Sequence, residues 1–291
     1  MNLVEIFTKF PKQEDCIAFL EEKRWHNKTV CPYCGSCKSS KESGLRHHCN
    51  KCNTSYSVLV NTIFHHTHLP LQKWFLAISL IVNAKKGISS RQLARDIKVT
   101  KDTAWRMQMQ IRQAMVETPS LMTGICEMDE TYIGGKSKGK RKGIEVKRGR
   151  GTQKVPVVGV VSRDLKHVKA QVLHKISFAD LKKVAENTID LENAILITDD
   201  YTGYIPFKDL IKHESVNHSK KEYVRGNIYT NTIEGFWATL KRGIVGQYHY
   251  LSDKYLAKYV NEFCFKYNNR NNKNIFDLLL NNSVKNYAYA R

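Results

Sequence analysis

The sequence lacks any apolar run long enough to cross a membrane, and it has few cysteines for its length. The longest apolar candidate, residues 74–82, spans nine positions, about half of the 18 or so that a membrane-spanning helix needs. The first residues show neither the basic stretch nor the apolar run of a secretory signal. Eight cysteines among 291 residues are too sparse for a disulfide scaffold. These absences predict a cytoplasmic protein with no segment inserted in a membrane.

Acidic residues are also scarce relative to basic ones. The chain has 47 Lys and Arg residues against 27 Asp and Glu residues, a formal net charge of +20 and a pI of about 9.6. A basic excess of this size indicates a polyanionic partner, either a nucleic acid or an anionic membrane surface. The hydrophobic share of 42% and the aromatic share of 10% allow enough apolar burial to exclude a disordered chain.

Changes in composition along the chain predict three domains. Residues 1–65 carry a short helix and a segment rich in cysteine, glycine and serine, and residues 66–118 are mostly helical. The second domain ends before Pro119, because a proline disfavours helix at the residue that precedes it. The third domain, residues 119–291, contains short β-branched runs typical of strands and further helices. The expected strands are 125–133, 155–161, 168–173 and 194–198, and the expected helices are 177–190, 230–242 and 252–267.

Two CxxC pairs in the first domain predict a zinc site. The four expected ligands are Cys31, Cys34, Cys49 and Cys52. Zinc prefers four ligands in a tetrahedron, and a site of four thiolates leaves no open position, so this zinc is expected to be structural. Three nearby residues are alternative ligands: Cys37, His47 and His48. The remaining cysteines are expected to be small buried hydrophobic residues.

Residues 87–106 have the pattern of a helix-turn-helix motif. Ser89 or Ser90 can cap a first short helix, and Thr100 can cap a second one. The second helix would present polar side chains outward, where they can reach phosphates and base edges in a major groove. The expected DNA-binding residues of this helix are Lys101, Thr103, Arg106 and Gln110. A plain helical hairpin is the alternative interpretation.

A glycine-rich basic segment at residues 134–151 separates the first two strands of the third domain. Among its positive residues, Lys142, Arg148 and Arg150 are expected to bind DNA. In this interpretation the segment holds backbone phosphates, whereas the alternative is a solvated hairpin tip.

Three acidic residues of the third domain are candidates for catalysis. Asp129 lies within an expected strand, Asp199 lies at the end of another, and Glu234 lies on a helix. Carboxylates are depleted from strand interiors and costly to bury without a partner, so Asp129 requires a cation. Oxygens from separate elements at one end of a sheet form a site for Mg²⁺. Two such ions can support an in-line attack on a phosphodiester.

Each candidate acid has an alternative. Asp199 can cap the turn after its strand, with Asp200 facing the metal, and Glu234 can be a solvated helix residue. Glu127 or Glu130 can replace Asp129, although we place these two glutamates together on a face that Asp129 does not share. Two further residues of the Glu234 helix have expected roles. Lys241 can contact DNA or pair with the helix dipole, and Trp237 is expected in the core.

These motifs together resemble bacterial insertion-sequence transposases of the DDE superfamily, in the branch with an N-terminal zinc ribbon and helix-turn-helix. The resemblance is carried by the order of those two motifs and by Met128-Asp-Glu-Thr-Tyr-Ile-Gly-Gly135 and Thr198-Asp-Asp-Tyr-Thr-Gly-Tyr204. It continues through residues 216–219 and 222–224, Asn231-Thr-Ile-Glu-Gly-Phe-Trp237, residues 241–243 and residues 246–249.

The resemblance implies an α/β RNase H-like catalytic core, a mixed sheet with flanking helices, after the zinc ribbon and helix-turn-helix. It implies Asp129 and Asp199 as the first two metal ligands, Glu234 as the third acid, and Lys241 following it. Some relatives of this branch use an asparagine as the third ligand, so Asn231 is an alternative. Asp200 stands where the family has a glutamate.

The resemblance also implies a DNA transposase. Such a protein binds terminal inverted repeats and uses Mg²⁺ or Mn²⁺ to hydrolyse a phosphodiester and transfer the strand. Its partners would be double-stranded DNA at the element ends and the target, and a second copy of the chain in a dimer or larger multimer. It would lie in the cytoplasm, associated with the nucleoid. The alternatives are a zinc-ribbon transcription regulator and an RNase H-like nuclease that does not join strands.

Overall fold

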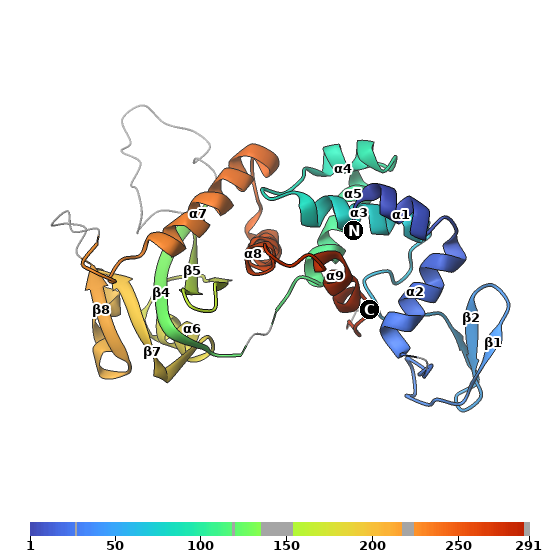
Figure 1. Ribbon diagram of the computed structural model, residues 1–291, viewed down its shortest axis with the longest axis horizontal. Helices are drawn as coiled ribbons and strands as arrows, with labels where there is room; N and C mark the ends of the chain where they lie inside the picture. The colour runs from blue at the N-terminus through green and yellow to red at the C-terminus, as the bar shows by residue number, and fades with distance from the viewer. Residues whose placement is uncertain (27, 118–119, 135–153, 217–223, 288–291) are drawn as a thin grey trace. The chain divides into compact units, whose positions relative to one another are not determined.

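The computed structural model describes residues 1–26, 28–117, 120–134, 154–216 and 224–287 (Figure 1). The chain divides into two compact units, one comprising Met1–Met115 with Asn272–Arg291 and the other Val116–Asn271. Several residues of the sequence predictions lie outside the described residues, namely Pro119, Lys142, Arg148, Arg150 and most of the motif at 216–224.

The second unit is built on a five-stranded mixed sheet with the order β6-β5-β4-β7-β8. Its strands are β4 (Met122–Ile133), β5 (Val155–Ser162), β6 (His167–Val172), β7 (Ile189–Asp199) and β8 (Lys212–Val216). Strand β5 is antiparallel to both of its neighbours, β4 and β6. Strand β7 is parallel to both of its neighbours, β4 and β8. This order and these directions are those of an RNase H-like core, so the predicted fold class is confirmed.

Helices cover both faces of this sheet (Figure 1). On one face, Met128 and Val160 pack in a buried cluster with Leu181 of α6 (Phe178–Glu186) and Tyr204 of η1 (Thr202–Asp209). Side chains alternate along a strand, so the other residues of β4 and β5 face the opposite side. There α7 (Asn231–Gly243) contacts β4 and β5, and α8 (Asp253–Asn268) packs on β6. A π-helical segment, η3 (Ile244–Tyr248), follows α7.

The predicted strands and helices of this unit are present with shifted ends, whereas β8 and η1 were not predicted. The sequence of β8, Lys-His-Glu-Ser-Val, is mostly polar because it is an edge strand with only Val216 fully buried. Its single buried position leaves no alternating pattern to recognise.

The first unit joins the zinc ribbon and the helical motif in one compact body. Its helices are α1 (Leu3–Lys9), α2 (Gln13–Trp25), α3 (Leu71–Asn83), α4 (Ser90–Asp96), α5 (Lys101–Gln113) and α9 (Ile275–Ser283). Its three-stranded sheet consists of β1 (Ser39–Glu42), β2 (Arg46–Cys49) and β3 (Thr54–Tyr56). Buried aromatic rings hold the helices together, since Phe75 of α3 makes edge contacts with Phe10 and with Phe276 of α9.

This division differs from the three domains expected from the sequence. The last helix, α9, belongs to the first unit rather than to the catalytic region, because its buried face of Phe276, Leu279 and Leu280 packs against α2 and α3. Among the described helices, none has the length and apolar character needed to span a membrane.

Candidate active site and zinc centre

The four predicted zinc ligands come together in the first unit. The sulfur atoms of Cys31, Cys34, Cys49 and Cys52 all lie within 4.8 Å of one another. Backbone N–H groups, first that of Cys52, lower the pKa of Cys49 to about 6, which favours the thiolate that zinc binds. Four sulfurs at this separation fit a tetrahedral zinc ion. The clustered cysteines therefore support a structural zinc ion, and these four residues stay its predicted ligands.

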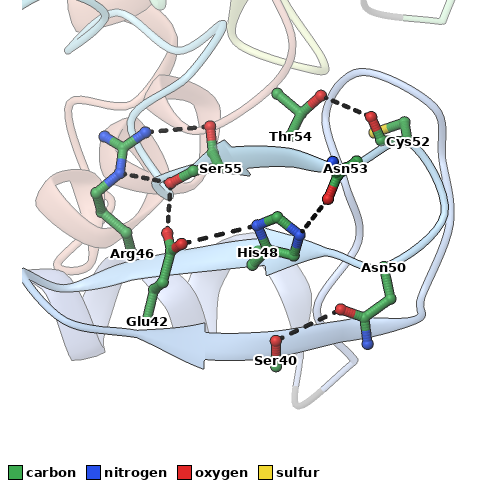
Figure 2. Close-up of polar contacts among 9 residues, drawn as sticks. All are labelled: Ser40, Glu42, Arg46, His48, Asn50, Cys52, Asn53, Thr54 and Ser55. Carbon is green, nitrogen blue, oxygen red and sulfur yellow. Dashed lines mark hydrogen bonds and ion pairs between the residues drawn. The ribbon is translucent and has the colours of Figure 1, made fainter.

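The three residues considered as alternative zinc ligands lie outside the group of four sulfurs. Cys37 is exposed, and His47 Nε2 lies 2.8 Å from Glu21 Oε1. His48 Nε2 lies 3.0 Å from Asn53 Oδ1, and its Nδ1 lies 3.7 Å from Glu42 (Figure 2). These two histidines therefore support the ribbon through polar contacts.

The ribbon is held together by polar side chains and the cysteines rather than by a sizeable apolar core. Every position of β1 is exposed or half-buried. Across the strands, Arg46 Nε donates to Ser55 Oγ over 2.8 Å, and Ser55 Oγ donates to Glu42 Oε2 over 2.5 Å (Figure 2). Such exposed contacts contribute little each, so we expect the ribbon to need its metal for stability.

Asp129 and Asp199 are neighbours in the sheet of the second unit. Strands β4 and β7 pair in parallel, with Ile125 beside Ile195 and Glu127 beside Ile197. Continuing this register by two residues places Asp129 beside Asp199 on the same face, across a strand spacing of about 4.8 Å. Paired residues of β4 and β7, such as Glu127 and Ile197, are 70 positions apart in the sequence, which is also the spacing between Asp129 and Asp199.

The faces of the other two acids of β4 differ from our expectation. Glu127 and Glu130 do not share a face, because Glu127 Oε2 accepts the backbone N–H of Ile233 on α7, whereas Glu130 Oε2 accepts the hydroxyl of Tyr204 on the opposite side. Glu127 therefore lies on the face of Asp129, two residues away. The earlier placement was wrong, and simple alternation along the strand explains the correction.

Helix α7 carries the third acid over this face. Trp237 Nε1 donates to Asp129 Oδ2 over 3.1 Å, which fixes α7 beside the first aspartate. Glu234 precedes Trp237 by about one turn, and its negative charge acts on Asp129. The charges of Asp199 and Glu234 therefore both act on Asp129, although the three acids come from three separate elements.

The carboxyl group of Asp129 lies where its charge is disfavoured. Burial, followed by the negative charges of Glu130, Asp199 and Glu234, raises the pKa of Asp129 to about 7. A divalent cation would favour the ionised form and offset this repulsion. Among the described residues, the four cysteines are the one group of three or more potential ligands whose ligand atoms all lie within 4.8 Å of one another, so the three acids form a looser group. Carboxylate oxygens around a half-buried acid whose charge is disfavoured fit Mg²⁺ or Mn²⁺.

The other predicted residues of this region lie at the surface. Asp200 follows β7, Asn231 begins α7, and Lys241 lies near its end, all exposed. Sequence reasoning placed Trp237 in the core, where it is 3% exposed, but missed its bond to Asp129. Gly159, opposite Asp129 in β5, is the signal for it, because a glycine inside a strand marks a close approach.

The helix-turn-helix prediction agrees with the local structure. Ser89 accepts from the Gln92 N–H at the start of α4, and Thr100 accepts from the Thr103 N–H at the start of α5. Of the predicted DNA-binding side chains, Lys101 and Arg106 are exposed, whereas Thr103 and Gln110 are half-buried. The sequence analysis missed the buried Gln108, which accepts from the Ser90 hydroxyl and donates to Ile88 O and so joins α4 to α5.

Replacing Gly159 by alanine should displace α7 from the sheet. A Cβ at Gly159 would lie 2.7 Å from the Trp237 ring and 3.2 Å from Ile233. Relief of such an overlap costs about 1–3 kcal/mol of unfolding free energy. Thermal unfolding measures this loss. The matched control is Gly235→Ala on α7, where a Cβ meets nothing within 4 Å and alanine should stabilise by roughly 0.5–1 kcal/mol. Equal stabilities of the two variants would contradict this packing.

The fold and the acids define a DDE transposase with a zinc ribbon, and the comparisons with known proteins agree. Residues 121–268, about half of the chain, match the ISXO2-like transposase domain family, and residues 11–55 match the transposase zinc-ribbon domain. The chain belongs to the ISXO2-like transposase family.

One curated relative spans nearly the whole chain. It is an uncharacterized protein in transposable element ISH50 of Halobacterium salinarum, 27% identical over 277 residues, which cover 87% of this chain and 90% of that protein. Among solved structures, the Mos1 strand transfer complex has a TM-score of 0.32 and 12% identity over 75% of this chain and 79% of the other. A pre-cleavage Mos1 transpososome has a TM-score of 0.29 and 11% identity over 74% and 79%. The strand order, rather than these distant likenesses, identifies the fold.

Proposed function

We propose that this protein is the transposase of an insertion sequence. It binds the terminal inverted repeats of the element, hydrolyses a phosphodiester to expose a 3′-hydroxyl, and directs that hydroxyl at target DNA. The observation that carries this proposal is the β4–β7 register, which sets Asp129 beside Asp199 under the helix that bears Glu234. The protein acts in the cytoplasm, on the nucleoid.

In this proposal each acid has a role at the site. Asp129 and Asp199 are the first two metal ligands, and Glu234 is the third, with Asn231, one turn earlier on α7, as the alternative. Bound there, two Mg²⁺ or Mn²⁺ ions supply an activated water or 3′-hydroxyl and stabilise the leaving oxygen. Trp237 holds the Asp129 carboxylate in one orientation through its N–H donor. Lys241, exposed about two turns beyond Glu234, contacts a DNA phosphate.

Two basic surfaces hold the DNA in this proposal. The first is the outward side of α5, with Lys101, Thr103, Arg106 and Gln110, which together with the zinc ribbon binds the element ends. The second is the basic segment of residues 134–151, with Lys142, Arg148 and Arg150 on backbone phosphates. Two ends must be processed together, so the working form is a dimer or larger multimer on DNA.

Replacing Arg106 by alanine should weaken binding to the element end. A base-edge contact by arginine is worth about 1–3 kcal/mol, roughly a 10- to 100-fold loss of affinity, with a smaller loss on an unrelated duplex. Fluorescence anisotropy at fixed salt on both duplexes measures this. Lys182→Ala on α6, which removes an exposed positive charge paired with Glu186, is the control and should bind as the parent does. Equal losses on both duplexes would assign Arg106 to phosphate binding instead.

The proposal is tested on duplex DNA copied from the sequences that flank the reading frame. With Mg²⁺, the parent protein should release a 3′-hydroxyl at the element end and join it to a second duplex, and Asp129→Asn should do neither. Binding without cleavage by the parent would identify a zinc-ribbon regulator. Cleavage without joining would identify an RNase H-like nuclease.

A further inference from the structure

A buried ion pair lies next to the three acids. Glu127 is fully buried on β4, two residues before Asp129 and on the same face. Its Oε1 lies 2.5 Å from Nε of Arg163, which follows the end of β5 and is also mostly buried. Burying such a pair costs desolvation free energy, so the pair adds little net stability over apolar side chains of the same volume. The contacts of the pair indicate a role other than stabilising the fold.

Arg163 uses its remaining donors on the segment that leads into α7. Nη1 donates to Asn227 O and Nη2 donates to Tyr229 O, both over 2.6 Å. The guanidinium carbon lies 3.5 Å from the centroid of the Tyr229 ring. A planar guanidinium with donors in fixed directions holds these three groups in one geometry, which a lysine does not reproduce.

Glu127 uses its second oxygen on the first turn of the same helix. Oε2 accepts the backbone N–H of Ile233 over 2.9 Å. The first N–H groups of a helix have no partner within it, and a negative charge at this end is favourable. One ion pair therefore binds both the approach to α7 and its first turn, the turn that holds Asn231 and Glu234.

We infer that the Glu127–Arg163 pair is a positioning device that sets the third acid against Asp129. This inference rests on the proposed function, since it assigns the pair to the same metal site. Glu127 and Arg163 touch neither metal nor DNA in it. They act through α7, whose polar contacts with β4 include Glu127 with Ile233 N–H and Asp129 with Trp237 Nε1.

The test is the affinity for Mn²⁺, measured by electron paramagnetic resonance on full-length protein with its zinc retained. Arg163→Lys keeps the positive charge but loses the planar guanidinium, whose N–H donors point in fixed directions. Loss of a residue that orients metal ligands lowers metal affinity or activity by about 10- to 100-fold, and we expect this drop in both Mn²⁺ affinity and cleavage rate. Binding to the element end should be unchanged.

A double variant guards against misfolding of the single one. Glu127→Gln with Arg163→Met removes both charges and leaves no buried charge without its partner. The matched control is Glu262→Gln with Lys266→Met, which removes another buried ion pair, both of whose residues lie on α8. Glu262 also accepts from the Tyr248 hydroxyl, and a glutamine there can still accept this bond. Because a buried ion pair adds little net stability, neither double should melt far from the parent, and only the first should lose Mn²⁺ affinity.

The outcomes separate the inference from the function on which it rests. Parent-like Mn²⁺ affinity in Arg163→Lys, or equal losses in the two double variants, would overturn the positioning role while leaving the proposed function intact. Full cleavage by Asp129→Asn would overturn the proposed function. A parent that binds no Mn²⁺ would overturn both.

Discussion

Replacing Asp129 by asparagine should reduce Mg²⁺-dependent cleavage on the order of 1,000-fold. The negative charges of Asp199 and Glu234 both act on this carboxylate, which we propose as the first metal ligand. Metal stabilisation of the transition state is worth several kcal/mol, and about 4 kcal/mol corresponds to three decades of rate. Asparagine keeps the size of the side chain and removes only the charge. Single-turnover cleavage of the end duplex, followed on a denaturing gel, measures the loss.

The same substitution should stabilise the protein when Mg²⁺ is absent. The folded-state pKa of Asp129, about 7, lies above the ordinary value of 3.8. The stability this group contributes is therefore fully present below pH 3.8 and is lost as the pH rises through 7. A shift of roughly three units corresponds to about 4 kcal/mol at pH 8. Asp129→Asn, which never ionises, should melt above the parent at pH 8 and close to it at pH 4.

The matched control for both effects is Asp190→Asn, an aspartate of β7 whose pKa has the opposite shift. Hydrogen bonds, first from the Asn193 side chain, lower the pKa of Asp190, so its ionised form is stabilising above the ordinary pKa. Asp190→Asn should cleave as the parent does and melt no higher at pH 8. Added Mg²⁺ should raise the melting temperature of the parent and of this control but not that of Asp129→Asn. A destabilised Asp129→Asn that still cleaves would contradict the assignment.

The acid positions were predictable because the strands that hold them have strong local patterns. The segment around Asp129 is apolar and β-branched, and so is the run that ends at Asp199, so two strands could be recognised. Their pairing register then matches the 70-residue spacing of the acids. The face of the sheet on which Glu127 lies could also be predicted from the sequence, since residues two positions apart on a strand, such as Glu127 and Asp129, share a face.

The contacts around these acids were not predictable in the same way. Trp237 bonds Asp129 across 108 positions of the chain, and Arg163 binds backbone carbonyls of residues 64 and 66 positions away. Carbonyl groups are present at every residue, so no side-chain pattern marks those partners. Likewise α9 packs with the first unit through an ordinary apolar face, which does not specify the surface that it covers.

Replacing Cys49 by serine should remove zinc from the protein and abolish its binding to the element ends. Structural zinc contributes about 10–16 kcal/mol to the folding of zinc-finger peptides, and the strands of this ribbon offer few buried positions to compensate. We therefore expect the ribbon to unfold. Zinc released into a colorimetric chelator after denaturation should fall from about one ion per chain to none. End-duplex binding should fall on the order of 100-fold, which corresponds to about 2.8 kcal/mol of binding free energy.

Cys37→Ser is the matched control, because Cys37 is an exposed cysteine of the same ribbon outside the ligand group. It should keep its zinc and bind the end duplex as the parent does. The acids lie in the other compact unit, so Cys49→Ser should still bind Mn²⁺ with parent affinity. This combination distinguishes loss of the ribbon from general unfolding. Retention of one zinc ion per chain by Cys49→Ser, or its loss from Cys37→Ser, would mean that the ion is held by a different set of ligands.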